Sequence, residues 1–321
     1  MIVYSSLTTK NCRHSYHRQL SRLPLLLCLT IAALLAPPIL AAVDDSVLPA
    51  PFPRLVPLHK PLGKPQSGDW LDRHTERGQT YREYVNGNPI RVDGQRRVIS
   101  IQPLGSFNAS ERKIVDLAAK FEGIYFQLPV QVRDDLPLTV IPGKARRTHP
   151  EWKTPQILST YVLDHVLKPR LPDDAVVSIA FTASDLWPGK GWNFVFGQAS
   201  LADRVGVWSM HRFGKPEASD ESFRLTLRRT LRTAVHETGH MFSMAHCIYN
   251  ECVMCGSNHL EEADRQPLWL CPPCLAKLHH ATGADPRKRF EDLIAFAKEN
   301  EMPDEEKFWR RSLAALPGER P

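Results

Sequence analysis

The chain has 321 residues, more than one compact domain usually needs and enough to bury a sizeable core. Its hydrophobic content of 42% is ordinary and argues against an intrinsically disordered protein. The net charge of +6 is mildly basic, but the lysines and arginines are scattered and are not interleaved with aromatic residues. The composition therefore gives no sign of a nucleic-acid-binding surface, and we expect no nucleic-acid partner.

Residues 1–42 predict an export signal. Basic residues such as Arg13 and Arg18 precede an apolar run at 23–35, and small residues follow at 41–42. We therefore expect a secreted or periplasmic protein from which this segment is cleaved. The alternative is an uncleaved signal anchor that tethers the chain to a membrane, because the apolar stretch reaches about 20 residues.

Residues 43–97 form a proline-rich N-terminal extension. Six prolines lie between residues 49 and 65, so we expect this part to run extended and to add little to the core. Two interpretations are open for the extension: a pro-segment that covers the active site, or a structural wrap around the main domain. We favour the wrap.

Residues 98–280 are expected to form the main domain. Their apolar patterns predict strands at 98–103, 130–132, 175–181, 192–199 and 204–213, and helices at 154–167 and at 110–121, with Ser110 as the N-cap. Strands that alternate with helices favour an α/β (α+β) fold with a mixed, mostly parallel twisted sheet. Residues 281–321 predict a C-terminal appendage of amphipathic helices.

A helix predicted from about Ser219 contains the most informative residues of the chain. Four positions separate His236 from His240, so both imidazoles project from one helical face and can bind one metal ion. His246 lies six residues further on, too far for the same face. The chain must therefore turn after about residue 242 to bring His246 back as a third ligand.

Three protein ligands leave one position of a tetrahedral zinc site open, as in catalytic rather than structural zinc sites. Glu237 follows the first ligand, where its carboxylate could reach a water at the open position without binding the metal. These residues predict a hydrolase in which zinc lowers the pKa of its water and Glu237 acts as the general base.

Four cysteines that follow the histidines form two pairs. Cys247 and Cys252 are separated by 18 residues from Cys271 and Cys274. This spacing matches a four-thiolate zinc site, but the cysteines of exported proteins also pair as disulfides, so the spacing leaves both interpretations open. Cys255 is left over, and we expect it to be a free, packed thiol.

The motif H-E-x-x-H-x-x-S-x-x-H, followed by Met254, resembles the metzincin zinc peptidases. The chain resembles one branch in particular, the archaemetzincins, in which a cysteine directly follows the third histidine, as Cys247 follows His246 here. This resemblance covers about residues 98–280. It implies a metzincin-like fold with an active-site helix, a Met-turn at Met254 beneath the metal, and a small C-terminal subdomain stabilised by zinc on the four cysteines. It thus implies two zinc ions per chain, one catalytic and one structural, and hydrolysis of a peptide or protein substrate. We expect a monomer.

Ser243 departs from the family pattern, which has glycine at this position. Glycine leaves a helix with positive φ at little cost, whereas serine in that conformation is strained by about 1 kcal/mol or more. The alternative function is therefore a zinc-binding, catalytically weak or inactive protein that serves as a peptide-binding module. For an active enzyme, we expect the substrate to pair with a sheet edge, and the resemblance implies that residues 194–199 form this edge.

Overall fold

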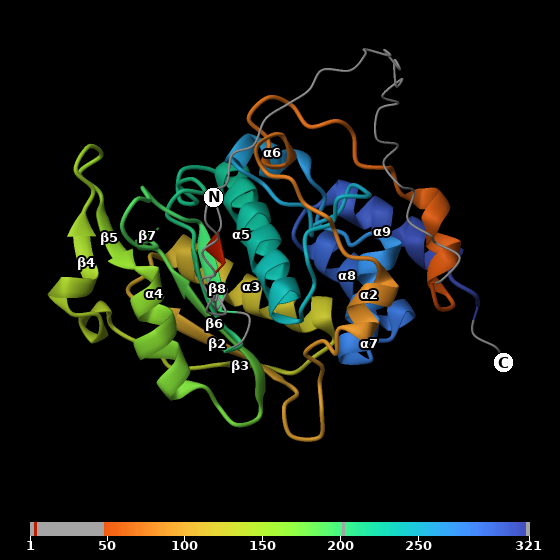
Figure 1. Cartoon of the computed structure of the whole chain (residues 1–321), viewed down its shortest axis with the longest axis horizontal. Helices are drawn as coiled ribbons and strands as arrows, with labels where there is room; N and C mark the ends of the chain where they lie inside the picture. Colours follow the sequence, from red (N-terminus) through yellow and green to blue (C-terminus); the bar gives the residue numbers. More distant parts are fainter. Residues whose placement is uncertain (1–2, 5–47, 201–202, 319–321) are drawn as a thin grey trace, which may run out of the picture.

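The computed structural model describes residues 3–4, 48–200 and 203–318, and its central feature is a six-stranded sheet in the order β1-β8-β9-β6-β2-β3 (Figure 1). The strands are β1 (Val3–Tyr4), β2 (Val98–Leu104), β3 (Val130–Val132), β6 (Ala175–Thr182), β8 (Gly197–Ser200) and β9 (Val205–Ser209). β8 and β9 pair antiparallel, and the other neighbouring strands of the sheet run parallel. The predicted mixed, mostly parallel sheet is confirmed.

Helices cover both faces of this sheet. On one face, α3 (Ala109–Phe126) packs against α5 (Asp220–Met241), and on the other lies the π-helical turn η5 (Val162–Leu167). Successive residues of β6 point to opposite faces: Phe181 belongs to the apolar core that includes α3 and α5, and Ala180 to the core that includes η5. The sheet is thus the middle one of three layers.

Residues 154–167, predicted as one helix, instead begin with a strand. β5 (Pro155–Leu158) pairs with β4 (Arg146–Thr148) and with β7 (Asp185–Trp187) in a second, three-stranded sheet. The helical turn α4 (Ser159–Tyr161) and then η5 follow it. The prediction was wrong for the first part of this segment because pairing with distant strands outweighs a local helical spacing of apolar residues.

Two predicted boundaries also differ. The N-cap of α3 is Asn108 rather than Ser110, because Asn108 and Glu111 form a capping box with backbone-to-side-chain hydrogen bonds of 2.9 and 2.8 Å. The predicted edge at residues 194–199 becomes a strand only from Gly197. This strand, β8, pairs with β9 on one side and with β1 on the other, so it is not a free edge in the structure.

The N-terminal extension contains η2 (Phe52–Leu58), α1 (Trp70–Arg73) and α2 (Tyr81–Asn86). We expected little core from the proline-rich part. Instead, Phe52 and Leu55 are fully buried and belong to the same core as α3 and α5. The extension therefore packs as part of the body of the protein, as Figure 1 shows for α2 beside α7.

The remaining helices are α6 (Leu260–Arg265), α7 (Pro272–Thr282), α8 (Pro286–Glu299) and α9 (Pro303–Ala315), with short 3-10 turns at Leu138–Val140, Gly143–Ala145 and Lys168–Arg170. α7 packs against η2 and α2, and α8 packs against α3 and α9. The indole of Trp309 on α9 is fully buried in the common core. The two last helices thus share that core with the extension and the sheet.

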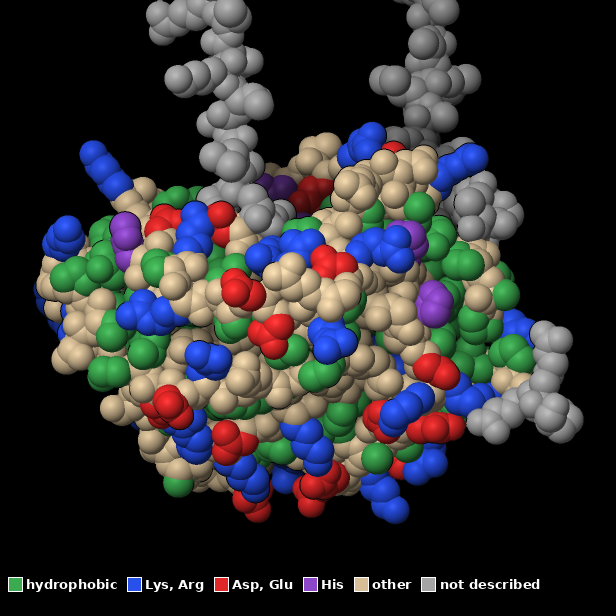
Figure 2. All heavy atoms as spheres, turned by 90° about the horizontal axis from the view of Figure 1, so that it is seen from below, with side chains coloured by type: hydrophobic (Ala, Val, Ile, Leu, Met, Phe, Trp, Pro, Cys, Tyr) green, Lys and Arg blue, Asp and Glu red, His purple; other side chains and the backbone are tan. Residues whose placement is uncertain are grey.

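Within the described residues, the helices are all too short or too polar to cross a membrane. The predicted export signal, residues 1–42, lies outside the described residues apart from Val3 and Tyr4, and it stays a prediction. Side chains of both charges are interspersed over the face shown in Figure 2.

Candidate metal centres

α5 begins at a local sequence signal. The hydroxyl of Ser219 accepts a hydrogen bond from the backbone N–H of Ser222, and acidic residues fill the first turn, where they interact favourably with the helix dipole. The last turns, which contain His236 and His240, are buried. The helix therefore holds both imidazoles in the interior, while its N-terminal end lies at the surface.

The chain leaves α5 through Ser243, whose φ of 66° lies in the left-handed region. The N–H of Ser243 donates to the carbonyl of His240 (2.8 Å), and the N–H of Met244 donates to that of Gly239 (3.1 Å). The Ser243 hydroxyl accepts a hydrogen bond from the N–H of Ile90 (3.1 Å). The serine thus adopts the conformation expected of glycine, and its side-chain hydrogen bond offsets part of the strain.

The turn brings His246 back toward the other two imidazoles. One ring nitrogen from each of the three histidines lies within 4.8 Å of the others, and the Nε2 atoms of His236 and His240 are 3.0 Å apart. The ring of His246 lies 5.3 Å from that of His236 and 4.9 Å from that of His240, centroid to centroid. Three buried nitrogens at these separations fit one zinc ion about 2 Å from each.

The outward ring nitrogens each contact an oxygen. In His236, Nδ1 lies 2.8 Å from the carbonyl oxygen of Val253. In His240, Nδ1 lies 2.6 Å from the carbonyl oxygen of Met244, and in His246 it lies 2.7 Å from Oε1 of Glu76. Because these oxygens accept hydrogen bonds, each Nδ1 carries the proton and each Nε2 presents its lone pair to the shared centre. Burial, reinforced by the neighbouring imidazoles, also holds the pKa of His236 and His240 well below the ordinary value, which favours the neutral form that metals bind.

Glu237, the predicted general base, is fully buried beside the first histidine of the motif. Neither of its carboxylate oxygens has a hydrogen-bond partner among the described residues. Burial raises the pKa of Glu237 to about 8, and the charge of Arg232 opposes this shift. A buried carboxyl group without a partner is costly, and groups of this kind occur often at functional sites.

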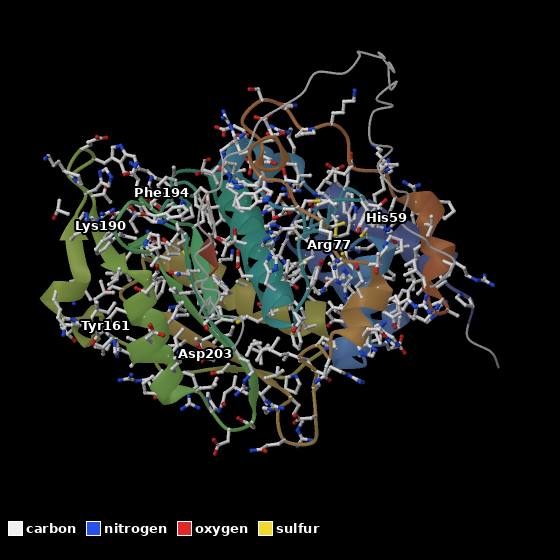
Figure 3. All side chains as sticks on the ribbon, in the orientation of Figure 1. His59, Arg77, Tyr161, Lys190, Phe194 and Asp203 are labelled. Atoms are coloured by element: carbon white, nitrogen blue, oxygen red, sulfur yellow. The ribbon has the colours of Figure 1, made fainter. Side chains whose placement is uncertain are left out.

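The four paired cysteines gather in a second buried cluster (sulfur atoms are yellow in Figure 3). Their sulfur atoms all lie within 4.8 Å of one another, and Sγ of Cys247 is 3.6 Å from Sγ of Cys271. Sγ of Cys252 accepts hydrogen bonds from the backbone N–H groups of Met254 (3.5 Å) and Cys271 (3.3 Å). Burial raises the pKa of Cys252 and Cys271, so several thiolates at this spacing need a cation between them.

The described cysteines are all free thiols, so the disulfides considered from the spacing are not formed in the structure. Cys255 lies outside the four-thiol group, and its Sγ contacts the carbonyl of Asn250 at 3.2 Å. It is buried, as expected for a packed thiol.

Met254 lies against the histidine-bearing helix. A Cβ atom placed on Gly239 would come within 2.6 Å of its sulfur, so any larger residue there would force the methionine side chain to shift. The carbonyl of Met254 accepts a hydrogen bond from the N–H of Cys247 at 2.9 Å, which joins the loop of the third histidine to the loop of Met254. The methionine is fully buried, and a Met-turn beneath the metal stays a prediction.

The family model of peptidase family M54 matches residues 107–280, more than half of the chain. The chain is also 34% identical over 271 residues to archaemetzincin-2 of Homo sapiens, covering 74% of this chain and 73% of that protein. The chain belongs to the archaemetzincin family. Archaemetzincins are zinc metallopeptidases, so this protein is a zinc-dependent hydrolase whose substrates are peptides or proteins.

Two further comparisons find other archaemetzincins. The chain is 39% identical over 109 residues to an archaemetzincin of Thermococcus kodakarensis, covering 32% of this chain and 56% of that protein. It is similar to a solved archaemetzincin of Archaeoglobus fulgidus, a malonate complex, at 30% identity with a TM-score of 0.45, covering 56% of this chain and 99% of that one.

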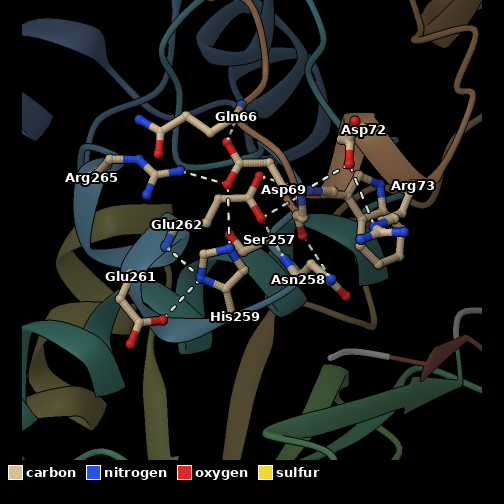
Figure 4. A network of polar contacts seen from close by, with 12 residues as sticks. Gln66, Asp69, Asp72, Arg73, Ser257, Asn258, His259, Glu261, Glu262 and Arg265 are labelled. Carbon is tan, nitrogen blue, oxygen red and sulfur yellow. Dashed lines mark hydrogen bonds and ion pairs between the residues drawn. The ribbon is translucent and has the colours of Figure 1, made fainter.

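A third group of potential ligands, Asp69, His259 and Glu262, differs from the two metal clusters (Figure 4). Its carboxylates are already used by protein donors: Asp69 pairs with Arg265 at 2.6 Å, and Glu262 accepts the backbone N–H of Trp70 at 2.9 Å. The imidazole of His259 caps α6. This group is a polar network that fastens the extension to α6, and we assign no metal to it.

Glu76 is the site residue that the sequence did not indicate. It lies 170 positions from His246, outside the residues that the family model matches. Burial favours the neutral carboxyl group, but the interactions with His246, Trp70 and His74 together outweigh this effect, and the pKa of Glu76 is below its ordinary value. No motif or periodicity surrounds Glu76, so we know of no local signal that could have found it.

Proposed function

We propose that His236, His240 and His246 bind the catalytic zinc of this archaemetzincin, and that Glu237 is the general base of peptide-bond hydrolysis. The observation that supports this most directly is the convergence of one ring nitrogen from each of three histidines whose Nδ1 atoms all contact an oxygen. Such outer contacts fix the tautomer and the orientation of metal-binding imidazoles.

The bound zinc supplies Lewis-acid chemistry, which polarises the scissile carbonyl and lowers the pKa of water. A carboxylate oxygen of Glu237 takes the proton of the attacking water and then delivers it to the departing amine nitrogen. Its buried, unpartnered oxygens suit this exchange because no protein donor competes for them among the described residues. The positive charge of a metal ion opposes the burial that raises the pKa of Glu237, and so favours the ionised base.

We also propose a second, structural zinc on Cys247, Cys252, Cys271 and Cys274, and thus two zinc ions per chain. Four converging thiol groups leave no open position for water in a tetrahedral site. Metal analysis with thiol titration tests this: we expect two zinc ions per chain and thiols that become reactive only when a chelator is added. One zinc ion per chain with two disulfides would contradict the second site.

The substitution Glu237→Gln tests the mechanism. We expect it to lower the rate of peptide cleavage about 10²- to 10⁴-fold, because the amide cannot accept the proton of the water. The zinc content should stay at the wild-type value, since Glu237 is not a ligand. Cleavage is measured on a peptide library, with metal analysis of the same samples.

Glu221→Gln is the matched control because Glu221 is an exposed residue in the first turn of the same helix. This variant should cleave like the wild-type protein. If Glu237→Gln cleaves as fast as the wild type, the proposed role of Glu237 is wrong.

The alternative of an inactive peptide-binding module depended on Ser243. Because Ser243 takes the left-handed conformation and the histidines still converge, we favour catalysis over this alternative. A wild-type protein that holds zinc but cleaves no peptide in the library would favour the binding module instead.

We further propose that the chain is exported and acts as a monomer. The proposal of export is supported by the basic residues, apolar run and small residues within residues 1–42. The mass of the mature protein isolated from its native host, together with its elution volume in size-exclusion chromatography, tests both points. A full-length mass would favour the uncleaved, membrane-tethered form.

A further inference from the structure

The loop that carries His246 is held by the N-terminal extension. The hydroxyl of Tyr84 donates to the carbonyl of Phe242 (2.8 Å), and the N–H of Ile90 donates to the hydroxyl of Ser243 (3.1 Å). Both donors lie outside the residues that the family model matches. The turn after α5 is thus stabilised by residues more than 150 positions away in the sequence.

Gln79 bonds to the same loop through both atoms of its side-chain amide. Its amide nitrogen donates to the carbonyl of Ser243 (3.2 Å), and its amide oxygen accepts the N–H of Ala245 (3.1 Å). Lys277 of α7 in turn donates to the backbone carbonyl of Gln79 (2.5 Å). α7 begins directly after Cys271 and contains Cys274, so Gln79 links the loop of the third histidine to a helix of the cysteine cluster.

Glu76 contacts His246 itself. Its Oε1 atom lies 2.7 Å from Nδ1, and Glu76 retains about a quarter of its side-chain exposure while His246 is buried. The ring of Trp70 packs edge-on against the same imidazole with 5.2 Å between centroids. Carboxylate and indole together restrict both the rotation and the tautomer of His246.

The ring nitrogen that Glu76 contacts shows whether Glu76 supports His246 as a metal ligand or blocks the metal site. The two nitrogens of an imidazole point away from each other, so Nε2, the nitrogen that does not contact Glu76, is the one that can join the other two histidines at a metal ion. Glu76 lies at Nδ1, away from the position that a substrate or an inhibitory ligand would take. A pro-segment that blocks the metal would have to reach the opposite side of the ring.

The polar network in Figure 4 anchors the start of this segment. Asp69 and Trp70 bond to Arg265 and Glu262, two residues of α6. The segment from Asp69 to Ile90 is therefore fixed at α6, at α7 and at the loop after α5.

We propose that Glu76 is a positioning residue for the third zinc ligand, and that residues 69–90 are an integral part of the metal centre rather than a removable cover. This inference rests on the proposed function, because it presupposes zinc on His246. In this chain, a carboxylate from the extension thus completes the catalytic zinc site.

The test compares zinc retention of the full chain with Glu76→Ala and Glu76→Gln. Each protein is titrated with a chromogenic zinc chelator, and the thiols are titrated in parallel. We expect Glu76→Ala to release one of two zinc ions about 10- to 100-fold more easily while the thiols stay protected, because loss of an outer carboxylate weakens the histidine site alone. The zinc affinity of Glu76→Gln should lie between those of the wild type and Glu76→Ala, since the amide oxygen still accepts a hydrogen bond from Nδ1 but has no charge.

Glu83→Ala is the matched control. Glu83 lies in the same segment and forms the capping box of α2 with Thr80, so its removal loosens the segment without removing the partner of His246. Zinc affinity should fall less in this variant than in Glu76→Ala, because His246 keeps its carboxylate partner. Equal weakening in Glu76→Ala and Glu83→Ala would overturn the specific role of Glu76.

His236→Ala separates this inference from the proposed function. If His236→Ala holds as much zinc as the wild-type protein, the proposed catalytic site itself is wrong. If His236→Ala removes one zinc but Glu76→Ala retains both with wild-type affinity, only the role of Glu76 is overturned.

Discussion

At the scale of single residues, Ser243 combines a strained backbone with a compensating side chain. Its φ of 66° costs a residue with a Cβ atom about 1–2 kcal/mol, and its hydroxyl gains about 1 kcal/mol through the bond to Ile90. Ser243→Ala keeps the strain and loses the bond, so we expect it to lower the free energy of unfolding by about 1 kcal/mol. Ser243→Gly loses both, and it should lie within about 1 kcal/mol of the wild type.

Urea unfolding of the zinc-loaded proteins measures these differences. The informative comparison is between the two variants, because both lack the hydroxyl and only alanine has the Cβ atom. Equal stability of the alanine and glycine variants would show that the left-handed conformation is not strained at this position.

A second residue, Glu122 of α3, predicts a dependence of stability on pH. Its carboxyl group is fully buried, and its oxygens have no hydrogen-bond partner among the described residues. Burial raises the pKa of Glu122 to about 8. The folded protein therefore favours the protonated form, so this contribution is fully present below the ordinary pKa of 4.5 and is lost as the pH rises through about 8.

Glu122→Gln should remove this dependence, because the amide is neutral at every pH. We expect the variant to be more stable than the wild type by on the order of 2 kcal/mol at pH 8, and equally stable near pH 4.5. Urea unfolding at several pH values measures the difference, with the exposed Glu291→Gln of α8 as the control. A stability difference that does not change between these pH values would contradict the buried, neutral carboxyl group.

At the scale of helices and strands, the sequence predicted those elements whose determinants are local. The start of α5 was predicted near Ser219 or Asp220, and the structure shows a capping hydroxyl and an acidic first turn there, both of which are local signals. β6 was predicted because its continuous apolar run suits a strand that is buried on both faces. The segment 154–167 failed because β5 forms only through pairing with β4 and β7, which lie elsewhere in the sequence.

The same distinction holds for the candidate site. The histidines, Glu237 and the cysteines lie within 39 positions of one another, and their spacing was enough to suggest two clusters. Glu76 and Gln79 act on those residues from a segment with prolines on one side and no repeating pattern, so only the folded chain brings them to the loop. The candidate metal ligands thus left a pattern in the sequence, and the residues of the extension that contact them did not.

At the scale of the whole molecule, the extension and the last two helices share one core with the central sheet. Phe52 and Leu55 of η2 and Tyr84 of α2 are buried in the same cluster as Trp309 of α9. Burial of large apolar side chains stabilises the fold by roughly 1.5–3 kcal/mol each. The extension should therefore stay bound even when its covalent link to the rest of the chain is cut.

A protease recognition site inserted between Gly94 and Gln95, in an exposed turn, provides this cut. We expect the cleaved protein to elute as one species in size-exclusion chromatography, and to keep both its zinc content and its rate of peptide cleavage, because residues 48–93 retain their buried contacts and Glu76 remains beside His246. Wild-type protein incubated with the same protease is the control. A pro-segment behaves in the opposite way: it dissociates after the cut, and peptide cleavage becomes faster. That outcome would show that the extension inhibits the enzyme, and the carboxylate at Nδ1 of His246 would then be dispensable for a working metal centre.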